Sequence, residues 1–490
     1  MNNYKEKVVV FGVGDYFVKC KNIIEGEYNI IAFTDNDIKK QGGVYENKDI
    51  IAPQKLLDYV YDKIVITSSY ETEIEQQLIK LGIESKNIVT SETILKRNLL
   101  KNENYIIMGK EVDNFIKRIK LLFCIDTLNG GGAEKVTVNL LNNIDYNKYE
   151  VELFVVFQNG IYFNEINKHV KIKVLIDESV PICLAENFIK RTSNKELYKY
   201  FINKSYDVEV ASIEGIATKI ISGSTNKNSR KIAWLHSDIK NYNITLKRFL
   251  NIREQEECYK KFNTIVVDSK GCKKSLLDVF NLNENNVKVV PTIIESENII
   301  RLSNEQNISF NKFTFCSVGA LTPVKGFDRL INIIYRLVKE GFDCNLLILG
   351  QGEDENKLKE MVGKLNIKDN VSFLGFVSNP YIYIKACNVF VLSSLSEGLS
   401  SVVCEALILG KTVISTDCSG TRELLGESSY GIVADNSEEG LYANMKRVMN
   451  DSSVIRYYEE MAKVRTELFK KEKIIAEVEK IIDNDRKLKA

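Results

Sequence analysis

Short apolar runs alternate with longer segments of helical periodicity along most of the chain. The apolar runs are rich in β-branched residues and predict strands at KVVVFG (7–12), YNIIAFT (28–34), KIVITS (63–68), IKLLFCID (119–126), YEVELFVVF (149–157), TIVVDS (264–269), FTFCSVGA (313–320), CNLLILG (344–350), VSFLG (371–375), VFVLS (389–393) and TVIST (412–416). Nearly continuous apolar runs suit strands that are covered on both faces. The pattern therefore predicts an α/β protein built of parallel sheets flanked by helices.

A strand, a glycine-containing loop and a helix follow one another at three places, and each would begin a domain of the nucleotide-binding type. They are VVVFGVGDYF (8–17), IKLLFCIDTLNGGGAEKV (119–136) and FCSVGALTPVKGFDRL (315–330). We therefore expect domains over 1–97, 118–300 and 312–452, with a linker at 98–117. The segment 453–490 predicts terminal helices that pack back on the N-terminal half.

Composition narrows the class of protein. A chain of 490 residues exceeds one hydrophobic core, and 44% hydrophobic with 27% charged residues is ordinary for a folded protein. The net charge of +1 gives no general attraction to nucleic acid, so we expect no nucleic-acid partner. The 10 cysteines form no C-x-x-C pair and suggest buried, reduced thiols. Neither a signal core nor a membrane span is evident, which predicts a cytoplasmic protein.

The stretch SEGLSSVVCEALIL (396–409) places Glu405 inside an apolar run. An ionised carboxylate is costly to bury without hydrogen-bond donors. Ser400 or Ser401 is expected to cap a helix that ends before Gly410, with Glu397 in the loop that precedes it. Two vicinal ribose hydroxyls would satisfy Glu405. The alternative is that Glu405 bonds a neighbouring backbone group or a basic side chain.

The order of motifs around this stretch resembles glycosyltransferase family 4, the retaining enzymes of the GT-B fold. The segments are FTFCSVGALTPVKGFDRLI, NLLILGQGE, NVSFLGFV, ACNVFVLSSLSEGLSSVVCEALILGKTVIST and GTRELL, preceded by TLNGGGAEKV, and they extend over about three quarters of the chain. Glu397 and Glu405, with seven residues between them, are the most specific element. The resemblance implies that Glu405 contacts the nucleotide ribose and that Glu397 faces the donor sugar.

The same resemblance assigns the donor diphosphate to Lys325, which follows the predicted strand 313–320. The ammonium would stabilise the departing nucleoside diphosphate. Taken alone, Lys325 reads as a solvated lysine at a helix start. The family usually has an arginine where this chain has Ala320, so the usual bidentate clamp is missing.

Further donor-site residues follow from the resemblance. Catalysis is assigned to Glu397, Lys325 and His236, and donor binding to Glu405, Gly398, Leu399, Ser400, Gly319, Gly375, Phe376, Glu423, Gly131 and Gly132. His236 is equally consistent with a structural role, and Glu423 with an exposed residue at a helix start. Gly375 and Phe376 would hold the base through backbone groups.

No metal site is expected. The triplets Asp-Asn-Asp at 35–37 and 483–485 imitate the D-x-D motif of glycosyltransferases with another fold. The resembling family needs no bound metal, so we expect neither a metal nor another cofactor, with the nucleotide-sugar as substrate.

Residues 1–97 resemble the small Rossmann-like domains attached to bacterial sugar-modifying enzymes. Gly12, Gly14 and Asp35 match parts of the dinucleotide fingerprint. Phe17 replaces its third glycine, and Asp15 would repel a pyrophosphate. A docking or regulatory domain without cofactor is therefore favoured over a dinucleotide-binding domain.

The segment 187–207 mixes five basic residues with aromatic ones. Such a stretch suits contact with the cytoplasmic face of an anionic membrane. The alternative, a helix packed on its own domain with a solvated basic face, is slightly favoured.

Together these observations predict a retaining glycosyltransferase. It would move a hexose or hexosamine from a UDP-sugar to a glycan or lipid-linked glycan in bacterial surface polysaccharide synthesis. The alternatives are a nucleotide-sugar epimerase on the same fold and a non-catalytic partner of another transferase. The few histidines speak against an epimerase, whereas Ala320 keeps the partner hypothesis open.

Overall fold

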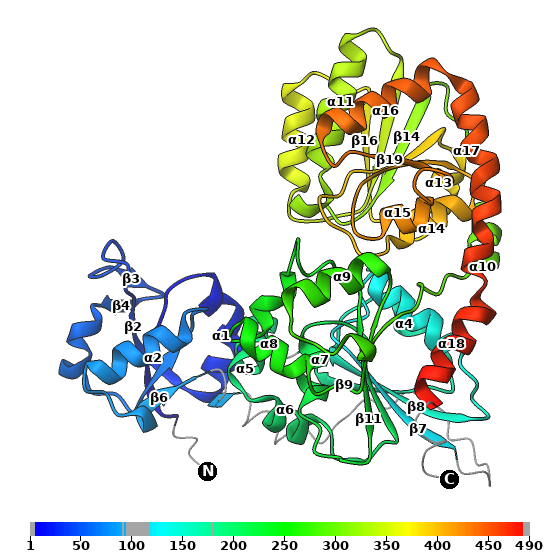
Figure 1. Cartoon of the computed structure of the whole chain (residues 1–490). Helices are drawn as coiled ribbons and strands as arrows, with labels where there is room; N and C mark the ends of the chain where they lie inside the picture. Colours follow the sequence, from blue (N-terminus) through cyan, green and yellow to red (C-terminus); the bar gives the residue numbers. More distant parts are fainter. Residues whose placement is uncertain (1–4, 91–92, 95–117, 179, 484–490) are drawn as a thin grey trace.

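The computed structural model describes residues 5–90, 93–94, 118–178 and 180–483, so the expected linker at 98–117 lies outside the described residues. Three parallel sheets follow one another along the chain, and helices cover them (Figure 1). We refer to the N-terminal, central and C-terminal units.

The N-terminal unit is a six-stranded sheet of order β3-β4-β2-β1-β5-β6, in which only β3 and β4 pair antiparallel. Its strands are β1 (Lys7–Phe11), β2 (Asn29–Thr34), β3 (Val44–Tyr45), β4 (Lys48–Ile51), β5 (Lys63–Ile66) and β6 (Ile88–Val89). Its described helices are α1 (Asp15–Glu27) and α2 (Glu71–Lys80).

The central unit is a seven-stranded parallel sheet of order β13-β12-β11-β10-β7-β8-β9. Its strands are β7 (Ile119–Ile125), β8 (Tyr149–Phe157), β9 (Lys171–Ile176), β10 (Val208–Ala211), β11 (Arg230–Leu235), β12 (Thr264–Val267) and β13 (Val287–Val289). The α-helices are α4 (Gly132–Asn143), α5 (Ile182–Arg191), α6 (Asn194–Phe201), α7 (Ile216–Ser222), α8 (Ile252–Tyr259) and α9 (Lys270–Val279).

The C-terminal unit is a six-stranded parallel sheet of order β16-β15-β14-β17-β18-β19. Its strands are β14 (Phe313–Val318), β15 (Cys344–Leu349), β16 (Val371–Gly375), β17 (Val389–Leu392), β18 (Thr412–Thr416) and β19 (Ile432–Ala434). The helices are α10 (Ser296–Ser303), α11 (Phe327–Lys339), α12 (Glu355–Lys364), α13 (Tyr381–Ala386), α14 (Ser401–Ile408), α15 (Thr421–Leu425), α16 (Glu438–Asn450) and α17 (Ser452–Arg465).

The chain crosses between the central and C-terminal units twice. After β13 it enters α10, which packs on α13 and α14. It returns after α17 as α18 (Lys471–Asp483), which lies along the central unit (Figure 1). Ile474, Val478 and Ile482 of α18 join the apolar core beside β7 and β8. The last helix therefore holds the two units together.

The N-terminal unit docks on α5 of the central unit. The hydroxyl of Tyr16 donates to the carbonyl of Cys183 at 3.0 Å, and Asn187 donates to Tyr16 and to the carbonyl of Ser68. Arg191 forms ion pairs with both Glu71 and Glu75 of α2. Polar contacts therefore supply much of this interface.

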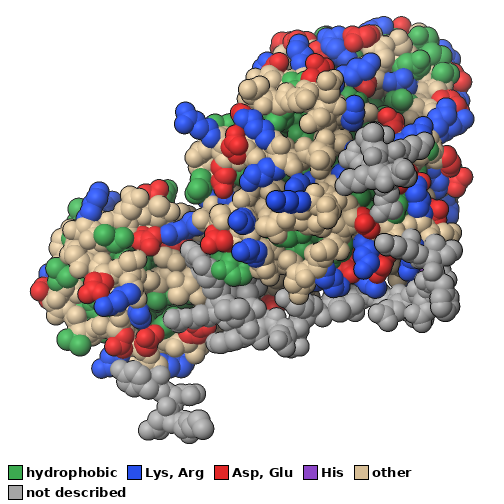
Figure 2. Space-filling model, turned by 60° about the horizontal axis from the view of Figure 1, so that its bottom comes forward, with side chains coloured by type: hydrophobic (Ala, Val, Ile, Leu, Met, Phe, Trp, Pro, Cys, Tyr) green, Lys and Arg blue, Asp and Glu red, His purple; other side chains and the backbone are tan. Residues whose placement is uncertain are grey.

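The basic segment at 187–207 forms the end of α5, α6 and the turn after it. Its aromatic residues Phe188, Tyr198 and Phe201 are buried in the central unit. Lysine and arginine side chains are interspersed with acidic ones on the face in Figure 2. Among the described residues, no helix combines the length and the apolar character needed to cross a membrane.

Candidate functional site

Glu405 lies on α14 in the wall of a small cavity between the central and C-terminal units. Burial raises the pKa of this carboxyl to about 7, against the opposing effects of Lys135 and the hydroxyl of Tyr381. From the described part of the chain, it accepts one long hydrogen bond, from Tyr381 at 3.4 Å. The carboxylate thus retains capacity for ligand hydroxyls.

Two helices begin at the same place, one from each unit. Ser400 stands at the N-cap of α14 but makes no capping bond with its side chain, so the expected serine cap is wrong there. Gly131 precedes α4, and a Cβ added at Gly132 would lie 2.8 Å from the hydroxyl of Ser401. The start of α14 offers N–H groups without an intrahelical partner, which favour an anion, whereas the carboxylate of Glu134 lies against the start of α4 and accepts its own backbone N–H.

Lys325 and Glu397 form an ion pair of 2.5 Å across the loops that follow β14 and β17. The hydroxyl of Ser394 also donates to Oε1 of Glu397, at 2.6 Å. In the described structure Oε2 has no hydrogen-bond partner, so it remains open to a ligand. The stem of Lys325 passes 3.6 Å from where a Cβ of Gly319 would lie, which places these two predicted residues together.

The loop after Glu397 closes on the central unit through its backbone. A Cβ added at Gly398 would lie 2.0 Å from the carbonyl oxygen of His236. Glycine is therefore required there for the observed contact, since any side chain would push the two units apart. The next residue, Leu399, turns to the apolar core of the C-terminal unit.

His236 follows β11, and its ring is buried. Nδ1 lies 2.9 Å from Asp268, and Nε2 lies 3.0 Å from the carbonyl of Ser212. Burial alone would lower the pKa of the imidazole, but the carboxylates of Asp268 and Glu214 outweigh it and raise the pKa to about 9. Both ring nitrogens are thus engaged, and the ring would reach a ligand only by giving up one of these bonds.

Glu423 lies in the first turn of α15 and faces the central unit. Its Oε2 accepts the backbone N–H of Lys270 at 2.8 Å, at the start of α9. Ser419 hydrogen-bonds Asp238 beside this contact. In this conformation Glu423 therefore joins the two units.

Gly375 ends β16, and Phe376 follows it. Gly375 has a φ of +68°, in the left-handed region, and its carbonyl accepts the N–H of Gly350 at 2.8 Å. The ring of Phe376 is 49% exposed and lies 3.1 Å from where a Cβ of Gly130 would stand. Gly375 and Phe376 therefore lie beside the glycine loop 130–132 of the central unit.

Ala320 is exposed, so no side chain reaches the Lys325 loop from there. Arg329 on α11 is the nearby guanidinium, but it donates to the carbonyl of Ser393 and to Asn436. Arg329 therefore stabilises the Lys325 loop through contacts within the protein, and burial lowers the pKa of its guanidinium.

Buried carboxylates at the end of the central sheet were missed by the sequence analysis. Asp126 follows β7 and accepts the N–H of Ala217 at 2.8 Å, and burial raises its pKa to about 7. Burial also raises the pKa of Glu134 and Glu214. A signal existed for Asp126 and Asp268, since each directly follows an apolar strand.

The acidic triplets do not form metal clusters in the described structure, where no group of three or more potential ligands is present. Asp35 instead accepts the N–H groups of Val13 and Asp37 and the ammonium of Lys40. Asp483 bonds Lys148 and Tyr149, while 484–485 lie outside the described residues.

Residues 298–465 match the family described as "Glycosyl transferases group 1", and residues 4–89 match the family described as "C2185-like, N-terminal". An uncharacterized glycosyltransferase of Methanocaldococcus jannaschii is 37% identical over 227 residues, which span 45% of this chain and 56% of that protein.

A second relative, from Campylobacter jejuni, is matched over nearly its whole length. It is 29% identical over 367 residues, which span 72% of this chain and 97% of that protein. It is named N-acetylgalactosamine-N,N'-diacetylbacillosaminyl-diphospho-undecaprenol 4-alpha-N-acetylgalactosaminyltransferase.

Solved structures share the arrangement of the central and C-terminal units. Anabaena HepE in complex with UDP and glucose matches with a TM-score of 0.61 at 16% identity, covering 75% of this chain and 100% of that one. WaaG, from lipopolysaccharide biosynthesis, matches with a TM-score of 0.54 at 15% identity, covering 74% and 99%. The expected GT-B fold with an additional N-terminal α/β unit is confirmed.

Proposed function

We propose that this chain is a glycosyltransferase of the GT-B superfamily that moves a hexose or hexosamine from a UDP-sugar to a glycan acceptor with retention of configuration, as in family 4. The observation that carries the proposal is Glu405. Its carboxylate stands between the two units, where the described residues offer it one weak donor, at 3.4 Å. Vicinal ribose hydroxyls supply the missing donors.

The diphosphate belongs between the starts of α4 and α14. The start of α14 offers unpaired N–H groups and the positive end of its dipole, and the start of α4 would offer the same once the carboxylate of Glu134 turns away from it. Lys325 adds a full positive charge close by, which stabilises the nucleoside diphosphate as the glycosidic bond breaks. This arrangement takes over the role of the arginine that Ala320 replaces.

The sugar ring belongs beside Glu397. Lys325 and Ser394 hold its Oε1, which leaves Oε2 to accept a sugar hydroxyl. The carboxylate orients the ring, and positioning with leaving-group stabilisation replaces a side-chain nucleophile. No metal or other cofactor takes part in this scheme.

The acceptor meets the central unit, where Asp126, Glu134 and Glu214 gather. Carboxylates of this kind accept hydrogen bonds from glycan hydroxyls. The name of the Campylobacter jejuni relative includes a diphospho-undecaprenol acceptor, which supports a lipid-linked glycan for this chain. A lipid-linked acceptor would place the protein at the cytoplasmic face of the membrane.

The N-terminal unit serves docking or regulation without a cofactor. Its Asp35, the residue that would bind a cofactor ribose, is occupied by three donors of its own unit. Asp15 also lies in the wall of its 470 Å³ cavity, at the start of α1. A pyrophosphate there would meet a like charge.

Incubation with a panel of UDP-sugars and lipid-linked glycans, followed by NMR of the product anomer, tests this function. We expect transfer from one UDP-sugar, with the anomeric configuration of the donor kept. Inversion would contradict the retaining mechanism, and an epimer formed without an acceptor would indicate the epimerase. Binding of no nucleotide-sugar would favour the non-catalytic partner.

A further inference from the structure

Lys135 reaches the cavity of Glu405 from the opposite unit. It lies in the first turns of α4 and lines this cavity together with Tyr381, Ser401 and Glu405. Its ammonium pairs with Glu165 at 2.5 Å and lies 4.8 Å from the ring centre of Tyr162. The carboxylates of Glu405 and Glu165 are therefore both near the ammonium of Lys135.

The partners of Lys135 differ in exposure. The side chain of Glu165 is 47% exposed, so its ion pair with Lys135 is weak and easily exchanged. Lys135 itself is only 24% exposed. A charge interaction on the buried side of this lysine, toward Glu405, is screened less than the one toward Glu165.

The groups around Glu405 come from several elements. Titratable or charged residues facing the cavity or the carboxylate are Lys135 of α4, Tyr162 and Glu165 in the 3₁₀ turn Tyr162–Glu165, Tyr381 of α13, Cys404 of α14 and Glu295 before α10. Glu295 is held by Lys471 at 3.1 Å and by Asn143. Lys135 is the cation whose charge favours the ionised form of Glu405.

We propose that Lys135 positions the donor nucleotide from the opposite unit, by keeping Glu405 ionised for the ribose, and that Glu165 tunes this effect by competing for the ammonium. The inference rests on the proposed function, because it assumes that Glu405 binds the ribose. Only an ionised carboxylate accepts hydrogen bonds on both oxygens without offering a proton. Lys135 is thus a positioning residue that acts through Glu405.

The two variants Lys135→Met and Glu165→Gln give opposite expectations. Loss of the ammonium disfavours the ionised Glu405, so the pH below which UDP binding weakens rises by about half a unit or more. At pH 7 we expect UDP to bind about twofold to fivefold more weakly. Glu165→Gln releases Lys135 toward Glu405, so the same midpoint falls.

The experiment is UDP titration calorimetry between pH 5.5 and 8.5 with the full chain. The phosphate of UDP titrates in this range, so each variant is compared with the wild type at the same pH. Lys171→Met is the matched control. Lys171 has 29% exposure and an ion pair of 3.2 Å with Glu150, and it begins β9, at the sheet edge away from the cleft. We expect its profile to match the wild type.

The outcomes separate the two proposals. Opposite shifts for Lys135→Met and Glu165→Gln support the inference. Shifts in one direction, or none, while the wild type binds UDP overturn it and leave the proposed function standing. Absence of UDP binding by the wild type at every pH contradicts the proposed donor, and the inference falls with it.

Discussion

At the residue scale, Glu405 combines a cost for folding with its proposed role in nucleotide binding. Burial raises its pKa to about 7, above the ordinary value of 4.5. A carboxyl with a raised pKa in the folded state binds protons more tightly there than in the unfolded chain. Folding stability is therefore highest below pH 4.5 as far as this group is concerned, and it falls as the pH rises through 7.

Glu405→Gln is expected to stabilise the fold while weakening UDP binding. The neutral amide avoids the cost of burying a charge, so the free energy of unfolding at pH 8 rises by about 2 kcal/mol. Near pH 4.5 the difference vanishes. Urea unfolding at both pH values measures this effect, and equal stability of variant and wild type at pH 8 would contradict it.

UDP affinity in the same variant should fall about thirtyfold or more, because a charged acceptor contributes about 2 kcal/mol over a neutral one. Calorimetric titration measures it. A glutamine variant that binds UDP as tightly as the wild type would separate Glu405 from the ribose.

Gly398→Ala is expected to impair transfer without unfolding either unit. The added methyl would lie 2.0 Å from the carbonyl oxygen of His236, so the units cannot close. We expect at least a tenfold fall in kcat/KM, measured with the active donor. Gly363→Ala on α12 is the control, since its Cβ would meet only Lys368, at 3.6 Å. Equal activity of both variants would contradict the role of this contact.

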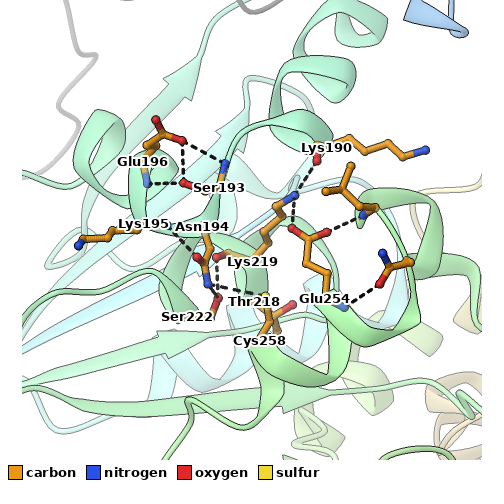
Figure 3. Close-up of polar contacts among 12 residues, drawn as sticks. Lys190, Ser193, Asn194, Lys195, Glu196, Thr218, Lys219, Ser222, Glu254 and Cys258 are labelled. Carbon is orange, nitrogen blue, oxygen red and sulfur yellow. Dashed lines mark hydrogen bonds and ion pairs between the residues drawn. The ribbon is translucent and has the colours of Figure 1, made fainter. Parts of the chain in front are cut away.

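At the element scale, a buried lysine joins three helices of the central unit. Figure 3 shows Lys219 of α7 between Lys190 of α5 and Glu254 of α8. Its ammonium donates to the carbonyl of Lys190 at 2.8 Å and pairs with Glu254 at 3.0 Å, and the side chain is fully buried. Burial lowers its pKa, so the pair with Glu254 is needed to keep the charge.

Lys219→Met should destabilise the protein by about 2 to 4 kcal/mol, because Glu254 and the Lys190 carbonyl lose their partner. The double variant Lys219→Met with Glu254→Gln should recover part of that loss. Chemical denaturation of the single and double variants measures the coupling. Additive effects would show that the ion pair contributes nothing.

The strands also show how much of the fold can be predicted from the sequence alone. Every apolar run that predicted a strand forms one, because a short continuous apolar run can be buried stably in few other structures. Among the strands that the apolar runs did not predict are β9 and β10, since KIKVLI alternates and VEVA buries Glu209 among apolar residues. Polar residues of both strands find partners on other elements: Lys173 donates to the carbonyl of Phe201 at 3.1 Å, and Oε1 of Glu209 accepts from Tyr198 at 2.9 Å.

The same limit applies to the candidate site. Glu405 can be recognised from the local sequence, because its own helix offers no hydrogen-bond donor to its carboxylate. Lys135 lies 270 positions away and reaches the same cavity only through the packing of two units. Likewise, nothing near His236 indicates that Asp268 and Ser212 occupy both ring nitrogens.

At the scale of the whole molecule, α5 couples the N-terminal unit to the cleft. Arg191 at its end pairs with Glu71 and Glu75, while the carbonyl of Lys190 is held by Lys219 of α7. The start of α7 in turn donates to Asp126 at the end of the central sheet. A physical connection thus runs from the N-terminal unit to the proposed acceptor side.

Arg191→Met is expected to release the N-terminal unit from α5, because the ion pairs of Arg191 with Glu71 and Glu75 are then lost. Small-angle scattering should show a larger radius of gyration. Lys195→Met, at an exposed position on the adjacent α6, is the control and should leave the dimensions unchanged. An unchanged radius for Arg191→Met would mean that the remaining contacts suffice for docking.

The central and C-terminal units must also move. In this conformation Gly132 adjoins Ser401, and Gly398 adjoins the backbone of His236. Only a small cavity remains beside Glu405 among the described residues, so the proposed nucleotide binding requires the units to separate and then to close again. The two chain crossings, before α10 and before α18, are where such a hinge belongs.

The most direct test is a crystal structure of the full chain with UDP. We predict that both ribose hydroxyls lie within hydrogen-bond distance of Glu405 and that the diphosphate occupies the space between the starts of α4 and α14, near Lys325. A structure in which UDP lies elsewhere, with Glu405 bonded only to protein groups, would contradict the account.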